Sequence, residues 1–345
     1  MTPGEAGDYA RAGVSFETAD AAKARISELV AGTRTPNSVG MVGAFGGMVR
    51  VPLGMRKPTL VLSTDGVGTK ILVAAQANRF DTIGEDLVNH CVNDILVHGA
   101  TPLAFMDYVA GAALDVEQIA SIVEGIARAC QAHEMALAGG ETAQLPGLYQ
   151  PGTYDLAGTI VGIVEEERAI HGTSIKPGDV LLGYASTGLH TNGYSLARRV
   201  IFEHMGLGLD DLLEGTGQTV ADELLAVHRS YYRSVRPVLG RIHGLAHITG
   251  GGIAGNLVRI LPQDCEALVD PAAWELPPLF RQLQQSGQIS TQEMREVFNL
   301  GVGLVAVLPP DAVAAAQAAA EGDGVTTWMM GEVQPGSRTV RFARP

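Results

Sequence analysis

Apolar and polar residues follow two different spacings in the first half of the chain. Four short runs rich in β-branched and other apolar residues have the length and composition of strands. They lie at 59–63, 103–109, 135–138 and 156–164. Two longer segments, 83–97 and 116–132, repeat apolar residues three and four positions apart, which predicts helices, and Asp115 stands where the N-cap of the second is expected. We therefore predict a mixed α/β unit.

A segment of charged residues, glycine and proline at 165–179 interrupts this pattern and predicts a domain boundary. We expect two domains, at residues 1–170 and 171–345. In the second domain we predict helices at 193–205, 219–227, 230–242, 253–260 and 277–286, and strands at 180–185, 245–249, 265–269, 301–308 and 325–333. The expected fold class is α/β, with mixed α+β sheets in both domains.

The helix predicted at 83–97 has an apolar side and a polar side. Asn93 and Asp94 lie on the polar side. A carboxylate beside so apolar a helix is costly unless it is paired or bound to a metal ion. A polar side that simply faces water would give the same pattern, so both interpretations stay open.

The charge and cysteine content exclude several classes of protein. Asp and Glu number 37 against 24 Lys and Arg, and the net charge of −13 would repel nucleic acid and anionic membranes. No run of about 18 apolar residues is present, and the first residues do not resemble a secretory signal. Three separated cysteines in apolar runs indicate reduced thiols. We expect a cytoplasmic protein with no nucleic-acid or membrane partner.

The 43 glycines form clusters of the kind found where backbone turns tightly or approaches a ligand. In TDGVGTK, at 64–70, an apolar run leads into Asp65, Gly66, Gly68, Thr69 and Lys70. Asp65 is a candidate ligand for Mg²⁺ and Lys70 a candidate partner for phosphate. The spacing is not that of a Walker A loop, and a hairpin turn is the alternative.

A second glycine cluster follows another short strand and contains Gly139, Gly140, Glu141 and Thr142. We expect Glu141 to lie on a glycine turn, as Asp65 does. The carboxylates of Asp65, Asp94 and Glu141 would then supply the oxygen ligands of a site for Mg²⁺ and ATP.

Two strand-to-helix turns in the second half carry histidines and anion-binding features. STGLHTNGYSL, at 186–196, contains Thr187, His190 and Asn192, and HITGGGI, at 247–253, contains His247, Thr249, Gly250, Gly251 and Gly252. Backbone N–H groups at the start of a helix favour a phosphate, and either histidine could act as a hydrogen-bond donor or acid. A histidine beside a glycine turn that only caps or packs is the alternative.

Several motifs, taken in order and spacing, resemble the phosphoribosylformylglycinamidine cyclo-ligases, the aminoimidazole ribonucleotide synthetases of purine synthesis. They are TDGVGTK, DTIGEDLVNHCVNDIL with GATPL, GGETAQLPG, YDLAGTIVG, STGLHTNGYSL, HITGGGI and FNLGVG. The match runs from about residue 8 to residue 333. The chain departs from the family at residues 9–15, where it reads YARAGVS and cyclo-ligases usually read like YKDAGVD.

This resemblance implies a homodimer in which the N-terminal sheets of two subunits join into a β-barrel. It also implies a ligase that binds ATP near the N-terminal glycine loops and closes the imidazole ring of formylglycinamidine ribonucleotide. Mg²⁺ would be held by Asp65, Asp94 and Glu141, and Lys70 would contact phosphate. His190 and His247 would orient the substrate or transfer a proton, while Asn192, Thr249 and the amides of Gly250, Gly251 and Gly252 would receive the substrate phosphate.

Two other classes of function remain open. One is a related enzyme, such as thiamine-monophosphate kinase, selenophosphate synthetase or formylglycinamidine ribonucleotide synthetase. The first cysteine is Cys91, whereas a selenophosphate synthetase is expected to have an N-terminal cysteine or selenocysteine. The other is a non-catalytic nucleotide-binding protein like those of hydrogenase maturation, against which the carboxylates and histidines count.

Overall fold

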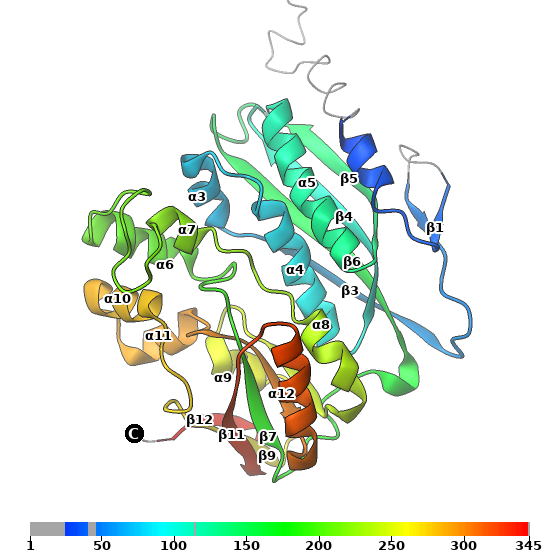
Figure 1. The fold of residues 1–345 in the computed structure, drawn as a ribbon, viewed down its shortest axis with the longest axis vertical. Helices are drawn as coiled ribbons and strands as arrows, with labels where there is room; N and C mark the ends of the chain where they lie inside the picture. The colour runs from blue at the N-terminus through cyan, green and yellow to red at the C-terminus, as the bar shows by residue number, and fades with distance from the viewer. Residues whose placement is uncertain (1–24, 41–45, 114, 344–345) are drawn as a thin grey trace, which may run out of the picture. The chain divides into compact units, whose positions relative to one another are not determined.

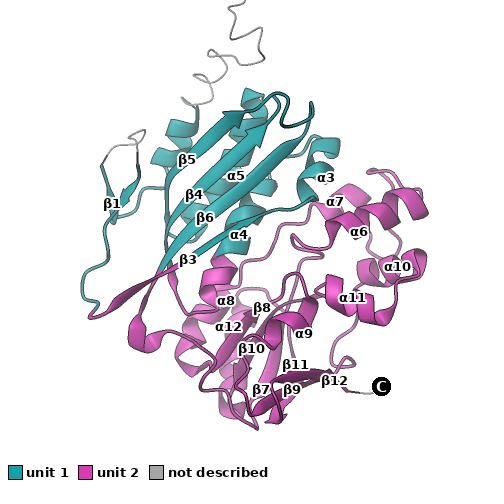
Figure 2. Cartoon of the chain, turned by 180° about the vertical axis from the view of Figure 1, so that it is seen from behind, with its two compact units in different colours: residues 1–55, 62–91, 102–162 teal, residues 56–61, 92–101, 163–345 magenta. Residues whose placement is uncertain are grey.

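The computed structural model describes residues 25–40, 46–113 and 115–343. The chain divides into two compact units, drawn in teal and magenta in Figure 2. Unit 1 comprises residues 1–55, 62–91 and 102–162, and unit 2 comprises residues 56–61, 92–101 and 163–345. The segment at 9–15, where the sequence departs from the cyclo-ligase pattern, lies outside the described residues.

Unit 1 holds most of a four-stranded sheet in the order β3-β6-β4-β5. Its strands are β3 (Pro58–Gly66), β4 (Thr101–Gly111), β5 (Ala136–Gln144) and β6 (Tyr154–Glu165). Strands β4 and β5 run parallel, and α5 (Val116–Ala132) makes the crossover that parallel neighbours require. A two-stranded antiparallel pair, β1 (Ser38–Val39) and β2 (Met48–Val49), precedes the sheet. The four strands predicted from the sequence are confirmed, and each is longer than predicted.

Helices α4 (Ile83–Leu96) and α5 cover one face of this sheet (Figure 1). They pack closely, since a Cβ atom on Gly84 would lie 2.0 Å from the carbonyl oxygen of Ile122. The Asp115 carboxylate caps α5 by accepting from two backbone N–H groups at 2.9 and 3.2 Å. Both predicted helices are confirmed. A further helix, α3 (Lys70–Ala77), was not predicted, and it divides TDGVGTK between the end of β3, a turn and a helix start.

The face of the sheet opposite these helices presents apolar side chains to solvent. Alternate residues of β3 are exposed, among them Leu60 at 51% and Leu62 at 64%, and Met106 of β4 is 39% exposed. Figure 2 shows this side of the sheet without a helix over it. A group of exposed large apolar residues on one face is characteristic of an interaction surface.

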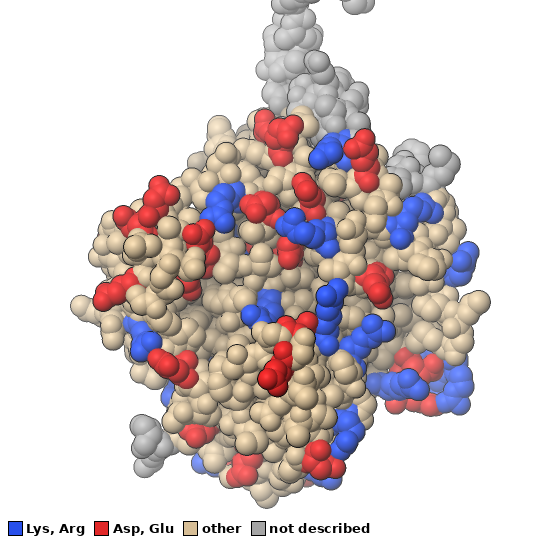
Figure 3. Space-filling view, viewed as in Figure 1, with Lys and Arg blue, Asp and Glu red and all other residues tan. Residues whose placement is uncertain are grey.

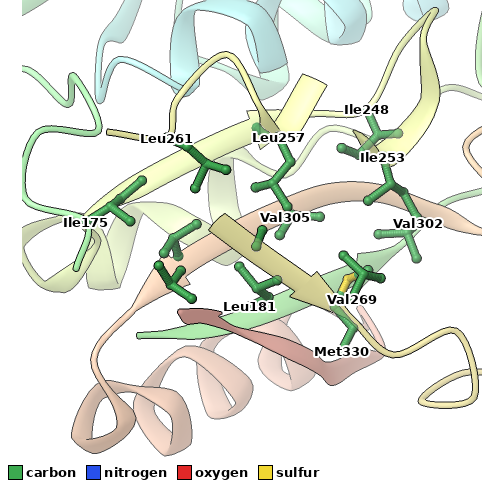
Figure 4. Close-up of a cluster of buried hydrophobic side chains, with 14 of the residues drawn as sticks. Ile175, Leu181, Ile248, Ile253, Leu257, Leu261, Val269, Val302, Val305 and Met330 are labelled. Atoms are coloured by element: carbon green, nitrogen blue, oxygen red, sulfur yellow. The ribbon is translucent and has the colours of Figure 1, made fainter. Parts of the chain in front are cut away.

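Unit 2 contains a six-stranded sheet in the order β12-β9-β11-β7-β10-β8. The strands are β7 (Val180–Ala185), β8 (Gly244–His247), β9 (Cys265–Val269), β10 (Val302–Leu308), β11 (Thr327–Pro335) and β12 (Thr339–Phe342). All neighbours are antiparallel except β12 and β9. Figure 4 shows the core, in which Leu181, Val305 and Met330 pack with Ile253 and Leu257. Every predicted strand of this half is present, and β12 is additional.

The helices of unit 2 are short. They are α6 (Tyr194–Arg198), a π-helical turn (Arg199–His204), α7 (Val220–Leu224), α8 (Tyr232–Val235), a 3₁₀ turn (Arg236–Arg241), α9 (Gly252–Leu257), α10 (Pro278–Gly287), α11 (Thr291–Val297) and α12 (Val313–Gly322). The helices predicted at 193–205 and 230–242 are confirmed in place. The first continues from α6 into the π-helical turn, and the second continues from α8 into the 3₁₀ turn. Helices α11 and α12 were not predicted. No helix of the described segments has both the length and the hydropathy to cross a bilayer.

Candidate functional site

A pocket of about 460 Å³ in unit 1 is lined by the second glycine cluster. Gly139, Gly140, Glu141 and Thr142 contribute to it, together with Gly47 and other residues of the segments at 26–39 and 46–49. The expectation that Glu141 lies on a glycine turn is wrong, because β5 stays paired with β4 as far as Gln144, after a shift in register between Phe105 and Met106. Glycine in this strand leaves space for a ligand next to the backbone.

Asp107 of β4 lines the same pocket and was not singled out from the sequence. Burial raises the pKa of its carboxyl group to about 7. Gly140 lies directly beside it, since a Cβ atom there would be 2.2 Å from Oδ1 of Asp107. The pocket therefore contains a carboxyl group that can be protonated near neutral pH and can then donate a hydrogen bond.

Asp65 stands near the end of β3, where its side chain is 45% exposed. One carboxylate oxygen accepts from the backbone N–H of Gly66 at 2.7 Å, and the other lies 2.9 Å from Nε2 of His90. His90 projects from α4 and was not among the candidate site residues predicted from the sequence. The carboxylate is held in position by these contacts while part of it still faces solvent.

Lys70 is enclosed in unit 1, with an exposed fraction of 0%. Its ammonium group lies 2.9 Å from each carboxylate oxygen of Asp86, which is equally buried. Burial lowers the pKa of Lys70, and the charge and hydrogen bond of Asp86 oppose that effect. The expected contact between Lys70 and phosphate is not met in this structure, because the ammonium group is buried against Asp86.

A group of hydrogen-bonded histidines lies in unit 2. Nδ1 of His247 lies 2.8 Å from Oδ1 of Asp94, and Nε2 of His247 lies 3.2 Å from Nε2 of His228. The ring of His190 stacks on that of His228, with centroids 4.0 Å apart. His190 has a φ of 60°, a left-handed conformation that is uncommon for a residue with a side chain. The structure therefore brings His190, His247 and Asp94 into one group, and His228 is a member that the sequence did not reveal.

The first predicted substrate turn, at 186–196, is joined to the second, at 247–253, by Asn192. Its Oδ1 atom accepts from the backbone N–H of Gly250 at 3.2 Å. Its Nδ2 atom is buried without a hydrogen-bond partner in the described part of the chain. Thr187 donates its backbone N–H to Nε2 of His190 at 3.2 Å and its hydroxyl to the carbonyl of Val227. Asn192 is thus a donor for which a ligand oxygen would be a suitable partner.

The glycine turn at 250–252 does not offer the free amides that the sequence suggested. The N–H of Gly250 is bonded to Asn192, that of Gly251 to the carbonyl of Glu296 at 3.0 Å, and that of Gly252 to the carbonyl of Thr249 at 3.1 Å. The Thr249 hydroxyl lies 3.3 Å from Oδ1 of Asn256. The expectation that these amides bind phosphate is not met, since each has an internal acceptor.

A pocket of about 510 Å³ lies beside this turn, and one of its lining residues is an arginine. It is lined by Gly251 and Gly255 and by Arg295, whose guanidinium carbon lies 4.0 Å from the centre of the Phe342 ring. An arginine held against an aromatic ring can still bind an anion through its N–H groups. Arg295 is the better candidate for the phosphate contact in this part of unit 2.

The three predicted metal ligands differ in their surroundings. Asp65 and Glu141 belong to unit 1, and Asp94 belongs to unit 2. No group of three potential ligand residues among the described ranges contains both Asp65 and Glu141. Carboxylate oxygens nevertheless match the preference of Mg²⁺ for hard ligands.

The sequence reasoning missed Asp107, His228 and Arg295. None of the three lies in a glycine cluster, and each is brought to its place by contacts with residues distant in sequence. The one local signal was a charged or titratable residue within an otherwise apolar run, as in FMDYVAG around Asp107.

Two family models match the chain in succession. Residues 47–164 match the N-terminal domain of AIR synthase related proteins, and residues 176–343 match the C-terminal domain. Over 328 residues, which are 94% of both chains, the sequence is 48% identical to a phosphoribosylformylglycinamidine cyclo-ligase from Citrifermentans bemidjiense.

Solved structures show the same fold at low sequence identity. A thiamine-monophosphate kinase from Stenotrophomonas maltophilia matches with a TM-score of 0.69 and 18% identity, over 95% of this chain and 96% of that one. The hydrogenase maturation protein HypE in complex with ATP matches with a TM-score of 0.66 and 21% identity, over 91% and 88%. Likeness at this level shows the fold alone, whereas the sequence match is specific. The chain belongs to the phosphoribosylformylglycinamidine cyclo-ligase family.

Proposed function

We propose that this enzyme closes the imidazole ring of formylglycinamidine ribonucleotide in de novo purine biosynthesis. ATP is consumed, and 5-aminoimidazole ribonucleotide, ADP and phosphate are released. The observation that carries the proposal is 48% identity over 94% of both chains to a named cyclo-ligase. The fold alone would not distinguish this activity from that of the thiamine-monophosphate kinase that shares it.

We assign ATP to the pocket of about 460 Å³ in unit 1. Its wall of glycines permits close approach to backbone, and a protonated Asp107 can donate to a nucleobase nitrogen. HypE, solved with ATP, has the same fold, which shows that such a fold accommodates the nucleotide. The proposed domains, 1–170 for ATP and dimerisation and 171–345 for the substrate, divide the chain between the two family matches.

Mg²⁺ would be held in unit 1 by Asp65 and Glu141, and Asp94, which belongs to unit 2, stays a ligand predicted from the sequence. All three are carboxylates, and the oxygens of Asp65 are partly exposed. When bound, Mg²⁺ would neutralise charge on the transferred phosphoryl group. Lys70 is removed from the set of phosphate contacts, and its proposed role is to neutralise Asp86.

The chemistry requires two steps at the formyl group. The terminal phosphoryl group of ATP is transferred to the formyl oxygen, and ADP leaves. The ribose-bearing nitrogen then attacks the same carbon, the C–O bond to phosphate breaks, and the nitrogen loses a proton. Positioning of the reactants supplies much of the rate enhancement in such a reaction.

The residues of unit 2 are suited to holding the ribonucleotide for these steps. His190 and His247 would orient it or transfer a proton, and Asn192 would donate through its buried Nδ2 atom. Thr187 and Thr249 are the remaining predicted substrate contacts. Arg295 would take the place of the three glycine amides in binding the substrate phosphate.

We also propose that the enzyme is a cytoplasmic homodimer. The exposed apolar face that includes Leu60, Leu62 and Met106 would be covered by the same face of a second subunit, joining two sheets into the barrel that the family resemblance implies. All three cysteines are free thiols, which suits a reducing compartment. Figure 3 shows acidic and basic side chains intermixed on the face in view, without the continuous basic area typical of nucleic-acid binding.

The purified chain should form 5-aminoimidazole ribonucleotide when it is incubated with ATP, Mg²⁺ and formylglycinamidine ribonucleotide. Thiamine monophosphate serves as the competing substrate, because it is the phosphate acceptor of a thiamine-monophosphate kinase, an enzyme that shares this fold. Formation of thiamine diphosphate without the imidazole product would favour the kinase. ATP binding without any product would favour a non-catalytic role.

A further inference from the structure

His228 is at the centre of the histidine group in unit 2. Its side chain is fully buried and lies just before α8, outside the glycine clusters. The ring stacks on His190 with an angle of 21° between the planes. Nε2 lies 3.2 Å from Nε2 of His247, and Nδ1 lies 3.2 Å from the hydroxyl of Thr191. One imidazole therefore contacts both proposed catalytic histidines.

Asn93 determines which nitrogen of His228 carries the proton. Its Oδ1 accepts from the backbone N–H of Tyr231 at 2.9 Å, and its Nδ2 donates to the carbonyl of Arg229 at 2.8 Å, so the orientation of the amide is fixed. The same Nδ2 lies 3.2 Å from Nε2 of His228. An amide nitrogen can only donate, so Nε2 of His228 accepts. The ring proton is then on Nδ1 and is donated to Thr191.

This tautomer has a consequence for His247. Two ring nitrogens that face each other at 3.2 Å need one donor and one acceptor. Since Nε2 of His228 is the acceptor, Nε2 of His247 is the donor. Nδ1 of His247 faces the Asp94 carboxylate at 2.8 Å, so both ring nitrogens of His247 donate and the orientation of the ring is fixed from both sides. His190 is held by the stack and by the N–H of Thr187.

We propose that His228 is a positioning residue that holds His190 and His247 in one hydrogen-bonded and stacked unit, with its own proton on Nδ1. This inference rests on the proposed function only for its effect on turnover, because the tautomer is a property of the folded protein alone. By holding the two imidazoles, His228 would keep them oriented toward the ribonucleotide.

A transition-metal site is the competing explanation of the same group. Ring nitrogens of His190, His228 and His247 lie within 4.8 Å of one another, a spacing that a metal ion could use. The hydrogen bonds argue against it, because Nε2 of His190 accepts from Thr187 and Nε2 of His228 from Asn93. Binding through these atoms would leave buried N–H groups without acceptors, which is costly.

The tautomer of His228 can be tested without measuring enzyme activity. Long-range ¹H–¹⁵N spectra of protein labelled at its nine histidines distinguish Nδ1–H from Nε2–H rings, and the His228 signals are those missing from His228→Gln. We expect the His228 ring to carry its single proton on Nδ1. A proton on Nε2, or a charged ring, would overturn the assignment. So would one equivalent of tightly bound Zn²⁺ or Co²⁺ that is lost in His228→Gln.

The effect on turnover is tested with two variants of opposite kind. His228→Phe keeps a ring to stack on His190 and removes the ring's hydrogen bonds with Asn93, His247 and Thr191, whereas His228→Gln keeps a donor and an acceptor. We expect His228→Phe to lower kcat about 10- to 100-fold, as loss of an orienting partner does for other functional histidines, with KM for ATP within about twofold of wild type. His228→Gln should recover at least about tenfold of the kcat that His228→Phe loses.

The exposed His171→Gln is the matched control and should behave as wild type. Equal losses in His228→Phe and His228→Gln, or wild-type kcat in His228→Phe, would refute the positioning role. If wild-type enzyme made no imidazole product, the proposed function would fail, and the spectra would still decide the tautomer.

Discussion

Substitution of Lys70 tests whether this residue neutralises Asp86 within the fold rather than contacting phosphate, because its ion pair with Asp86 is entirely buried. The two groups are 2.9 Å apart and both have an exposed fraction of 0%. At an effective dielectric constant of about 20, the direct attraction at such a distance is about 6 kcal/mol. Part of this is offset by the cost of taking both charges out of water.

In Lys70→Met, Asp86 would be left as a buried carboxylate and would take up a proton instead. Protonating an aspartate of ordinary pKa, about 3.9, costs about 4 kcal/mol at pH 7 and about 1.5 kcal/mol at pH 5. We therefore expect the free energy of unfolding of Lys70→Met to fall by about 4 kcal/mol at pH 7 and by clearly less at pH 5. The double variant Lys70→Met with Asp86→Leu should recover most of the loss, since no charge remains unpaired.

Urea unfolding followed by circular dichroism at pH 5 and pH 7 measures these differences, provided that the slope m is unchanged. A Lys70→Met protein that unfolded within about 1 kcal/mol of wild type at pH 7 but had lost ATP turnover would refute the structural role of Lys70. That result would return Lys70 to the phosphate site.

Three further predictions follow from the described contacts. Asp107→Asn should become more stable relative to wild type as the pH rises from about 4 to about 7, because over that range the wild-type carboxyl ionises in the unfolded protein but, with its pKa raised to about 7, stays protonated in the folded protein; a pH-independent difference in urea midpoint would contradict this. Gly252→Ala should lower the free energy of unfolding by about 2 kcal/mol or more, since its φ is +62° and a Cβ atom would lie 1.9 Å from the carbonyl oxygen of Arg295. Gly255→Ala, with nothing within 4 Å, is the control, and equal stability of the two variants would be the contrary result. Leu62→Glu should convert the proposed dimer into monomers in sedimentation velocity, and an unchanged dimer would exclude the exposed sheet face as the interface.

The sequence predicted the elements whose periodicity is strong and local. Helices α4 and α5 have long, continuous apolar sides, and β7 and β9 are short apolar runs with clear ends. Helix α12 was missed because its sequence, VAAAQAAAEG, is rich in alanine on every side and has little contrast between buried and exposed positions. The short helices of unit 2 are stabilised by packing more than by their own periodicity.

The candidate site was predictable where a functional residue adjoins a glycine turn or, like Asp94, lies on the polar side of a strongly amphipathic helix. His190 and His247 could be found in this way, and the contact of His247 with Asp94 joins two of the predicted residues. His228 could not be found, because its interaction with Asn93 spans 135 residues. The sequence also could not show that the amides at residues 250–252 are already hydrogen-bonded. Their acceptors include Asn192 and Glu296, which lie on other segments of the chain.

The proposed cyclo-ligase reaction is tested most directly by following the formyl oxygen of the substrate into phosphate. Formylglycinamidine ribonucleotide labelled with ¹⁸O in the formyl group is incubated with the enzyme, ATP and Mg²⁺, and the products are analysed by mass spectrometry. If ATP activates the formyl oxygen before ring closure, one ¹⁸O appears in inorganic phosphate for each 5-aminoimidazole ribonucleotide formed. Unlabelled phosphate, or ADP formation without the imidazole product, would contradict the account.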